Sequence, residues 1–109
     1  MEQEFDLIYR NHILQAITEI ESFILSMDYK IFSQDRKTQL AVVKELEIIG
    51  EASKRLSEEY KKKFPAILWR EIAGMRDVLI HDYMAMDMID VWDSATEGVK
   101  ELKKALESI

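Results

Sequence analysis

Residues 13–24 read Ile-Leu-Gln-Ala-Ile-Thr-Glu-Ile-Glu-Ser-Phe-Ile, and this stretch decides the fold class. Its isoleucines stand at spacings of four, three and four residues, as Ile13, Ile17, Ile20 and Ile24. Because an α-helix turns once in about 3.6 residues, this spacing places the isoleucines on one face. We predict an amphipathic helix from about Phe5 to Met27, with Leu14 and Leu25 widening its apolar stripe.

Three further segments repeat this apolar spacing. A second helix is predicted from about Arg36 to Lys62, after a break in which Ser33 or Asp35 can cap its start. Pro65 suits the first turn of a third helix, because its fixed φ and missing N–H are tolerated there. The last helix is predicted from about Asp87 to Ser108. The apolar stripes of these helices are Val42, Leu46, Ile49, Ser53, Leu56 and Tyr60; Leu68, Ile72, Met75 and Leu79; and Met88, Trp92, Ala95, Val99, Leu102 and Leu106.

Strand signals are missing from this sequence, since no segment alternates apolar and polar residues in steps of two. Four amphipathic helices with short connections predict an all-α fold, and an antiparallel four-helix bundle buries all four stripes. No internal repeat or linker divides residues 1–109, so we expect a single domain.

The composition is typical of a soluble helical protein without disulfides, with 48% hydrophobic and 33% charged residues, three glycines, one proline and no cysteine. The lack of cysteine agrees with a reducing cytoplasm and excludes thiolate catalysis and cysteine-ligated zinc. Apolar runs are only a few residues long, and no charged-then-apolar leader begins the sequence. We therefore expect a cytoplasmic protein with no membrane span and no signal peptide.

The net charge of −6 argues against a broad surface that neutralises many phosphates, although a small site for a few nucleotides stays open. Basic residues gather at Lys54-Arg55, at Lys61-Lys62-Lys63 and at Lys100, Lys103 and Lys104. We interpret these clusters as solvated faces and as helix C-terminal charges favoured by the helix dipole.

Chemically versatile side chains concentrate in residues 76–83, Arg-Asp-Val-Leu-Ile-His-Asp-Tyr. In a helix, Asp77 and His81 are neighbours at i, i+4. Arg76 and His81 are instead separated by about 140° around the axis, which disfavours contact within one regular helix. Either the helix distorts here, or the two groups converge across an interface. On the predicted third helix, Arg76 falls at the edge of the apolar face, while Asp77 and His81 fall on the side turned away from the core.

Most familiar catalytic motifs are missing. Neither His12 nor His81 has a glutamate three positions before it, which argues against a di-metal bundle site, and no Gly-rich loop or serine elbow is present. His12 is interpreted as a locally hydrogen-bonded boundary residue. His81 and Arg76 suit metal-free phosphoryl transfer, because histidine exchanges protons near neutrality and arginine matches phosphate oxygens. Asp77 could hold His81 or raise its pKa. From the residues alone, a structural salt-bridge cluster is the alternative.

Arg76-x-x-x-x-His81-x-Tyr83 resembles the R-x(4–6)-H-x-Y signature of the HEPN superfamily, and specifically of the HepT-type toxins of prokaryotic toxin–antitoxin pairs. Further segments resemble this family in the same order: Leu46-Glu47-Ile48-Ile49-Gly50-Glu51-Ala52, Phe64-Pro65, Trp69, Gly74-Met75-Arg76 and Val91-Trp92. The resemblance thus covers nearly the whole chain. It departs from the family at Asp77, where asparagine is frequent, and the aspartate adds a negative charge beside the expected phosphate site.

This resemblance implies a HEPN-like bundle that forms a homodimer, with Arg76 and His81 of both subunits lining a shared cleft. It implies metal-independent endoribonuclease activity without a cofactor, by attack of the ribose 2′-hydroxyl on the adjacent phosphate. Arg76 and His81 would be catalytic, with Asp77 and Tyr83 supporting. It further implies a toxin of a type VII-like pair, whose cognate minimal nucleotidyltransferase antitoxin silences RNA cleavage by transferring AMP to Tyr83.

A second hypothesis comes from another functional class. It is a non-catalytic helical module that binds a nucleotidyltransferase and positions its substrate. The net charge of −6 and the presence of Asp77 favour this alternative.

Overall fold

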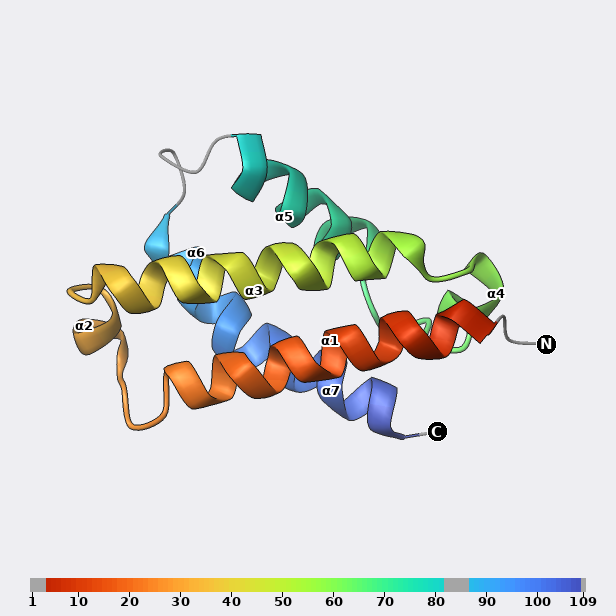
Figure 1. Ribbon diagram of the computed structural model, residues 1–109, viewed down its shortest axis with the longest axis horizontal. Helices are drawn as coiled ribbons and strands as arrows, with labels where there is room; N and C mark the ends of the chain where they lie inside the picture. The colour runs from red at the N-terminus through yellow and green to blue at the C-terminus, as the bar shows by residue number, and fades with distance from the viewer. Residues whose placement is uncertain (1–3, 82–86, 109) are drawn as a thin grey trace.

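The computed structural model describes residues 4–81 and 87–108, and every regular element in this part of the chain is helical (Figure 1). The elements are α1 (Glu4–Phe23), α2 (Tyr29–Phe32), α3 (Arg36–Arg55), α4 (Glu58–Lys61), α5 (Trp69–His81), α6 (Met88–Asp93), the π-helical turn η2 (Ser94–Gly98) and α7 (Val99–Glu107). The predicted all-α fold is therefore confirmed. The described residues divide into more helical segments than the four expected, and the antiparallel four-helix arrangement stays a prediction.

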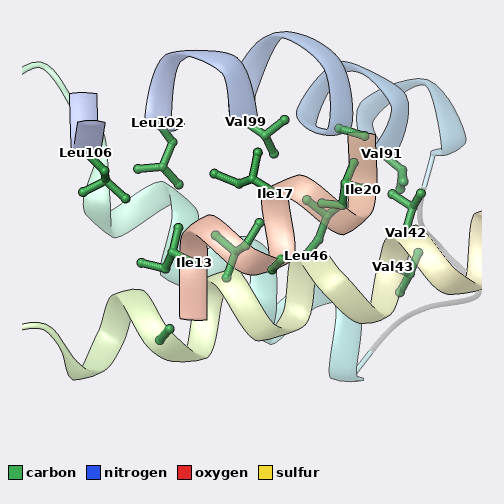
Figure 2. Packing of buried hydrophobic residues seen from close by; sticks show 14 of the residues in the cluster. Ile13, Ile17, Ile20, Val42, Val43, Leu46, Val91, Val99, Leu102 and Leu106 are labelled. Carbon is green, nitrogen blue, oxygen red and sulfur yellow. The ribbon is translucent and has the colours of Figure 1, made fainter. Parts of the chain in front are cut away.

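The two long helices α1 and α3 lie side by side, and the C-terminal helices cover them on one side (Figure 1). Their facing stripes form the centre of the core together with side chains of α6 and α7 (Figure 2). The predicted residues Ile13, Ile17 and Ile20 are completely buried, and Ile24 is half-buried. All six residues predicted for the second stripe are buried as well: Val42, Leu46, Ile49, Ser53, Leu56 and Tyr60.

Helix α1 ends at Phe23, earlier than the predicted Met27. Ser26 takes a positive φ of 67°, a left-handed conformation that ends the helical run. The chain then turns away from the core. Leu25, which was expected to widen the apolar stripe, is instead 77% exposed, so that prediction was wrong.

Two side-chain caps start the next segments. Asp28 accepts a hydrogen bond from the Ile31 N–H at 2.9 Å and begins the short helix α2, which the sequence analysis did not predict. Asp35 accepts one from the Thr38 N–H at 3.1 Å and another from the Thr38 hydroxyl at 2.8 Å. Asp35, rather than Ser33, is therefore the N-cap of α3.

The second predicted helix is in fact two helices. Helix α3 ends at Arg55 because Leu56 has an extended backbone, with ψ of 142°. Ser57 then caps the separate helix α4 by accepting from the Tyr60 N–H at 3.1 Å. Leu56 and Tyr60 stay buried on either side of this break, so the apolar spacing continued although the helix did not.

The third and fourth predicted helices also begin or divide differently. Pro65 lies in a turn, and α5 begins four residues later at Trp69. Leu68, predicted as the first residue of its apolar stripe, is 62% exposed. Asp87 caps α6 by accepting from the Ile89 N–H at 2.8 Å, as its predicted position at the helix start indicated. The last predicted helix is interrupted by the wider turn η2. Within the described residues, no helix is both long and apolar enough to cross a membrane.

Candidate functional site

Helix α5 carries most of the predicted site, and its first turn is held in place by aromatic packing. The Trp69 indole N–H donates to the Lys61 carbonyl oxygen at 3.3 Å. The Phe64 ring lies against both Trp69 and Tyr60, with ring centroids 6.3 Å and 5.3 Å away. Buried Phe64 and Tyr60 thus connect the turn at Pro65 to the body of the protein, and they fix the position at which α5 begins after α4.

The predicted catalytic positions fall in the last two turns of α5. Arg76, Asp77 and His81 belong to this helix, while their side chains lie outside what the structure describes. Tyr83 lies outside the described residues altogether. The α-helix runs without interruption from Trp69 to His81. Of the two alternatives raised by the 140° separation of Arg76 and His81, a distorted helix is therefore not observed.

The neighbouring positions of α5 agree with the predicted orientation of the helix. Ile72 and Met75 are half-buried, and α3 is the main packing partner of α5. Gly74 is exposed, and a Cβ atom added to it would meet nothing within 4 Å. Helical register places position 81, seven residues later, nearly in line with Gly74. Around Gly74, α5 thus has an open side next to a side that packs on the core.

The C-terminal helical segment, unlike α5, contains a distortion. The π-helical turn η2 inserts extra backbone between α6 and α7, and such turns are frequent at functional sites. The hydroxyl of Ser94, at the start of η2, donates to the sulfur of Met75 at 3.4 Å. Met75 directly precedes Arg76, so η2 contacts the helix at the beginning of the predicted motif.

Helix α3 supplies the other family-like segment. Gly50 and Ala52 are buried in it. Glu51 accepts from the guanidinium of Arg55 at 3.1 Å, and that guanidinium lies 5.9 Å from the ring centre of Tyr9 in α1. The contact of Arg55 with Tyr9 connects α3 to α1. Because α5 packs mainly on α3, α3 forms the base on which α5 is positioned.

His12 forms a ring contact, and among the residues that the structure describes the expected local hydrogen bond is not found. Its ring meets Tyr9 edge to face, with centroids 5.7 Å apart and planes at 86°. His12 is exposed and lies beside the contact between Tyr9 and Arg55. It therefore belongs to the surface where α1 and α3 meet.

A pair of carboxyl groups between α1 and α3 was missed by the sequence analysis. Glu45 is only 5% exposed, and its Oε2 atom has no hydrogen-bond partner. Burial, followed by the hydrogen bond and charge of Glu19, raises the pKa of Glu45 to about 7. Glu45 stands three residues after Val42, and Glu19 immediately precedes Ile20, so both glutamates lie at the edge of a predicted apolar stripe. This position was the signal by which the sequence could have indicated the pair.

Asp6 is a second buried acid that was missed. It is completely buried, and its two carboxylate oxygens accept from the N–H and the hydroxyl of Ser57, each at 2.7 Å. Asp6 therefore fastens the start of α1 to the cap of α4. Its position seven residues before Ile13 places it on the buried stripe, which the sequence could have shown.

The basic clusters are arranged as the sequence analysis interpreted them. Lys54 and Arg55 stand in the last turn of α3, and Lys104 in the last turn of α7. Lys61 pairs with Glu58 at 3.6 Å, and Lys103 pairs with Glu21 of α1 at 3.1 Å. Carboxylates thus compensate several of these cations, which fits a small phosphate site better than a broad one. Among the residues that the structure describes, no three histidine, aspartate or glutamate side chains gather where they could hold a metal ion.

Comparisons with known proteins agree on one family. The family model described as "Ribonuclease HepT-like" matches residues 13–109, a range that contains every candidate catalytic position. "Probable ribonuclease HepT" of Thermococcus cleftensis is 43% identical over 101 residues, which cover 93% of this chain and 92% of that protein.

Two further relatives are also matched over most of their length. "Putative RNase MJ0125" of Methanocaldococcus jannaschii is 40% identical over 89% of this chain and 84% of its own length. "Putative RNase TTE0752" of Caldanaerobacter subterraneus subsp. tengcongensis is 37% identical over 93% of this chain and 90% of its own length. No solved structure matches the chain.

Proposed function

This chain belongs to the HepT-like ribonuclease family, and we propose that it cuts RNA without a metal ion, using Arg76 and His81 as its catalytic residues. Family membership makes the chain an RNA endonuclease. The observation that carries the assignment to these residues is the family match over residues 13–109, which encloses both positions in one uninterrupted helix.

The proposed chemistry needs only the groups of the motif and the RNA. His81 accepts the proton of a ribose 2′-hydroxyl, and the 2′-oxygen attacks the adjacent phosphorus. Arg76 stabilises the negative charge that builds up on the phosphate oxygens. The bond from phosphorus to the 5′-oxygen then breaks, and the leaving oxygen takes a proton from protonated His81, which returns to its neutral form. The products are a 2′,3′-cyclic phosphate and a 5′-hydroxyl, so no oxidant, cofactor or metal ion enters the reaction.

The proposal includes a homodimer. Positions 76 and 81 are about 140° apart on an uninterrupted α5, so one helix does not bring both side chains to one phosphate. Two copies of α5 that face each other would bring Arg76 of one subunit toward His81 of the other. Residues 1–109 then form one HEPN-like domain, an antiparallel four-helix bundle in outline, and the shared cleft lies at the subunit interface.

Regulation would act on Tyr83, two residues after His81. In the proposed type VII-like toxin–antitoxin pair, a minimal nucleotidyltransferase transfers AMP to the Tyr83 hydroxyl in the cytoplasm. The added phosphate brings negative charge and bulk beside Arg76, and it therefore repels and blocks the RNA phosphate. Asp77 is proposed to orient His81 from one helical turn away.

The test is RNA cleavage in EDTA by the unmodified chain and by the variants Arg76→Ala and His81→Ala. We expect the unmodified chain to cut and His81→Ala to lose about 10²–10⁴-fold in rate, the usual contribution of a proton-transferring group. Arg76→Ala should lose about 10²–10³-fold, as for removal of one group that stabilises charge in the transition state. Circular dichroism verifies that the variants stay helical.

Equal cleavage by all three proteins would contradict the assignment of these residues. The absence of cleavage in all three would instead favour the alternative hypothesis, a non-catalytic module that positions the substrate of a nucleotidyltransferase. Mass spectrometry after incubation with ATP and that enzyme tests the regulation, since Tyr83→Phe should gain no AMP.

A further inference from the structure

A groove with a volume of about 350 Å³ runs between α5 and the C-terminal helices. Leu46 and Ile49 of α3 form its floor. Ile72 and Met75 of α5 line one wall, and Val99 and Leu102 of α7 line the other. In Figure 1, α5 and α7 lie on different sides of α3. The lining is thus a continuation of the apolar core that opens to the surface.

Two features of the chain leave this groove unfilled. Gly98, the last residue of η2, lines it without a side chain, and a Cβ atom added there would come no closer than 3.9 Å to its neighbours. Leu68 lines the opposite wall and is 62% exposed. Exposed apolar surface of this kind is costly in water and is a mark of binding sites.

The rim of the groove is acidic. Glu71 on α5 and Glu101 on α7 line opposite walls, and both residues are exposed. None of the described residues that line the groove is lysine, arginine or histidine. This charge repels RNA phosphates and attracts cations. An occupant should therefore combine an apolar group for the floor with positive charge on both sides of it.

We propose that this groove binds a helical segment of a protein partner that presents one large apolar side chain flanked by lysine or arginine. The volume lies at the low end of the roughly 300–1,000 Å³ of typical ligand pockets, so it accommodates an anchor side chain rather than a whole helix. Binding of an amphipathic helix through such anchors is a recurrent mode of recognition. Because Met75 lines the groove and directly precedes Arg76, the bound segment contacts the helix that carries the proposed catalytic residues.

The test measures binding rather than cleavage, so its outcome is independent of the proposed ribonuclease chemistry. The probe is a fluorescent alanine-rich helical peptide with one central phenylalanine flanked by lysines. A second peptide has glutamates in place of the lysines, and a third has serine in place of the phenylalanine. Fluorescence anisotropy compares the unmodified chain with Glu71→Lys/Glu101→Lys, which reverses the charge of the rim. The matched control is Glu97→Lys/Glu107→Lys, which changes two exposed acids outside the groove lining.

We expect the lysine peptide to bind the unmodified chain and the control, and to bind the rim variant at least about tenfold more weakly, which corresponds to about 1.4 kcal/mol. The glutamate peptide should show the reverse preference. The serine peptide should bind none of them.

A second variant keeps the proposal falsifiable if charge reversal disturbs the fold. Gly98→Leu fills the groove with little strain at its Cβ and should abolish binding of the lysine peptide, whereas Gly74→Leu, on an exposed turn outside the groove, should not. Equal binding of the lysine peptide to the unmodified and rim-reversed chains would overturn the proposal. Displacement of the peptide by a short RNA would also overturn the proposal, because it would assign the groove to RNA. So would a rim variant whose self-association differs from that of the unmodified chain, because it would assign the groove to a second copy of this chain.

Discussion

The pair of helices α1 and α3 differs from helix α5 in how completely each is packed. Between α1 and α3, Ile13, Ile17 and Ile20 are fully buried against a continuous apolar stripe (Figure 2). Helix α5 has only half-buried apolar residues in its described side chains, such as Ile72, and it borders an open groove. The two long helices thus provide the stability, and α5 rests on α3 with surface left over for binding.

This difference explains why the candidate site is on α5. A side chain that must reach a substrate cannot also be enclosed by the core, and elements that bind or move are drawn from the less stable part of a protein. The tightly packed base formed by α1 and α3 holds the position of α5. The predictions below test this division between a stabilising pair and a functional helix.

The largest effect on stability is expected from Ile17→Ala in α1. It removes a completely buried side chain and should lower the free energy of unfolding by about 2–5 kcal/mol. Ile72→Ala in half-buried α5 should cost about 1 kcal/mol, because less apolar surface is lost. Urea denaturation followed by circular dichroism measures both values. Equal losses for the two variants would contradict the proposed difference between the helices.

The next effect is expected from Asp6→Ala, which removes both hydrogen bonds to Ser57. The cap of α4 then loses its connection to α1, and the variant should be destabilised by about 1.5–3 kcal/mol, as for hydrogen bonds to charged groups. Asp90→Ala, at an exposed acid of α6, serves as the control and should change the free energy of unfolding much less. The same urea titration gives the result. A stability equal to that of the control would show that Asp6 does not join the two helices.

The smallest effect is a dependence of stability on pH, caused by Glu45 at the contact between α1 and α3. Its pKa is about 7 in the folded state, above its ordinary value of 4.5, so the folded state binds more protons than the unfolded state between these values. The contribution of the protonated group is complete below pH 4.5 and is lost as the pH rises through about 7. The effect is small at neutral pH, because a folded-state pKa of about 7 leaves the Glu45 carboxyl about half ionised there.

The variant Glu45→Gln tests this dependence. It stays uncharged, so it should be more stable than the unmodified chain above pH 7, and this advantage should shrink as the pH falls toward 4.5. Thermal unfolding across this range measures the difference. An advantage that does not change with pH would rule out titration of Glu45 as the cause.

Much of the fold could be predicted because helical periodicity reports burial directly. The isoleucines of α1 and the whole second stripe are buried as expected, even though Leu56 and Tyr60 lie on either side of a helix break. The positions of the helix ends were harder to predict, because they depend on single backbone conformations. The positive φ of Ser26 and the extended backbone of Leu56 have no strong sequence signal, since neither residue is glycine or proline.

The candidate site was predictable in its position and not in its surroundings. Spacing alone placed positions 76 and 81 on one helix and separated them around its axis, and the structure describes that helix. The groove lined by Met75 depends on how α3, α5 and α7 pack and on the turn η2, which is a tertiary arrangement that periodicity does not encode. Glu45 and Asp6 were missed for a related reason, because charged residues were assigned to the surface.

The central claim is that Arg76 of one subunit and His81 of another form one site for RNA cleavage, and mixing two inactive variants tests it most directly. Arg76→Ala and His81→Ala are unfolded together, refolded as a mixture, and assayed for RNA cleavage in EDTA. In the shared cleft of a mixed dimer, one intact Arg76 faces one intact His81 of the other subunit, so we predict that the mixture regains activity that neither variant has alone. Activity that remains absent in a mixture shown to contain mixed dimers would contradict the claim.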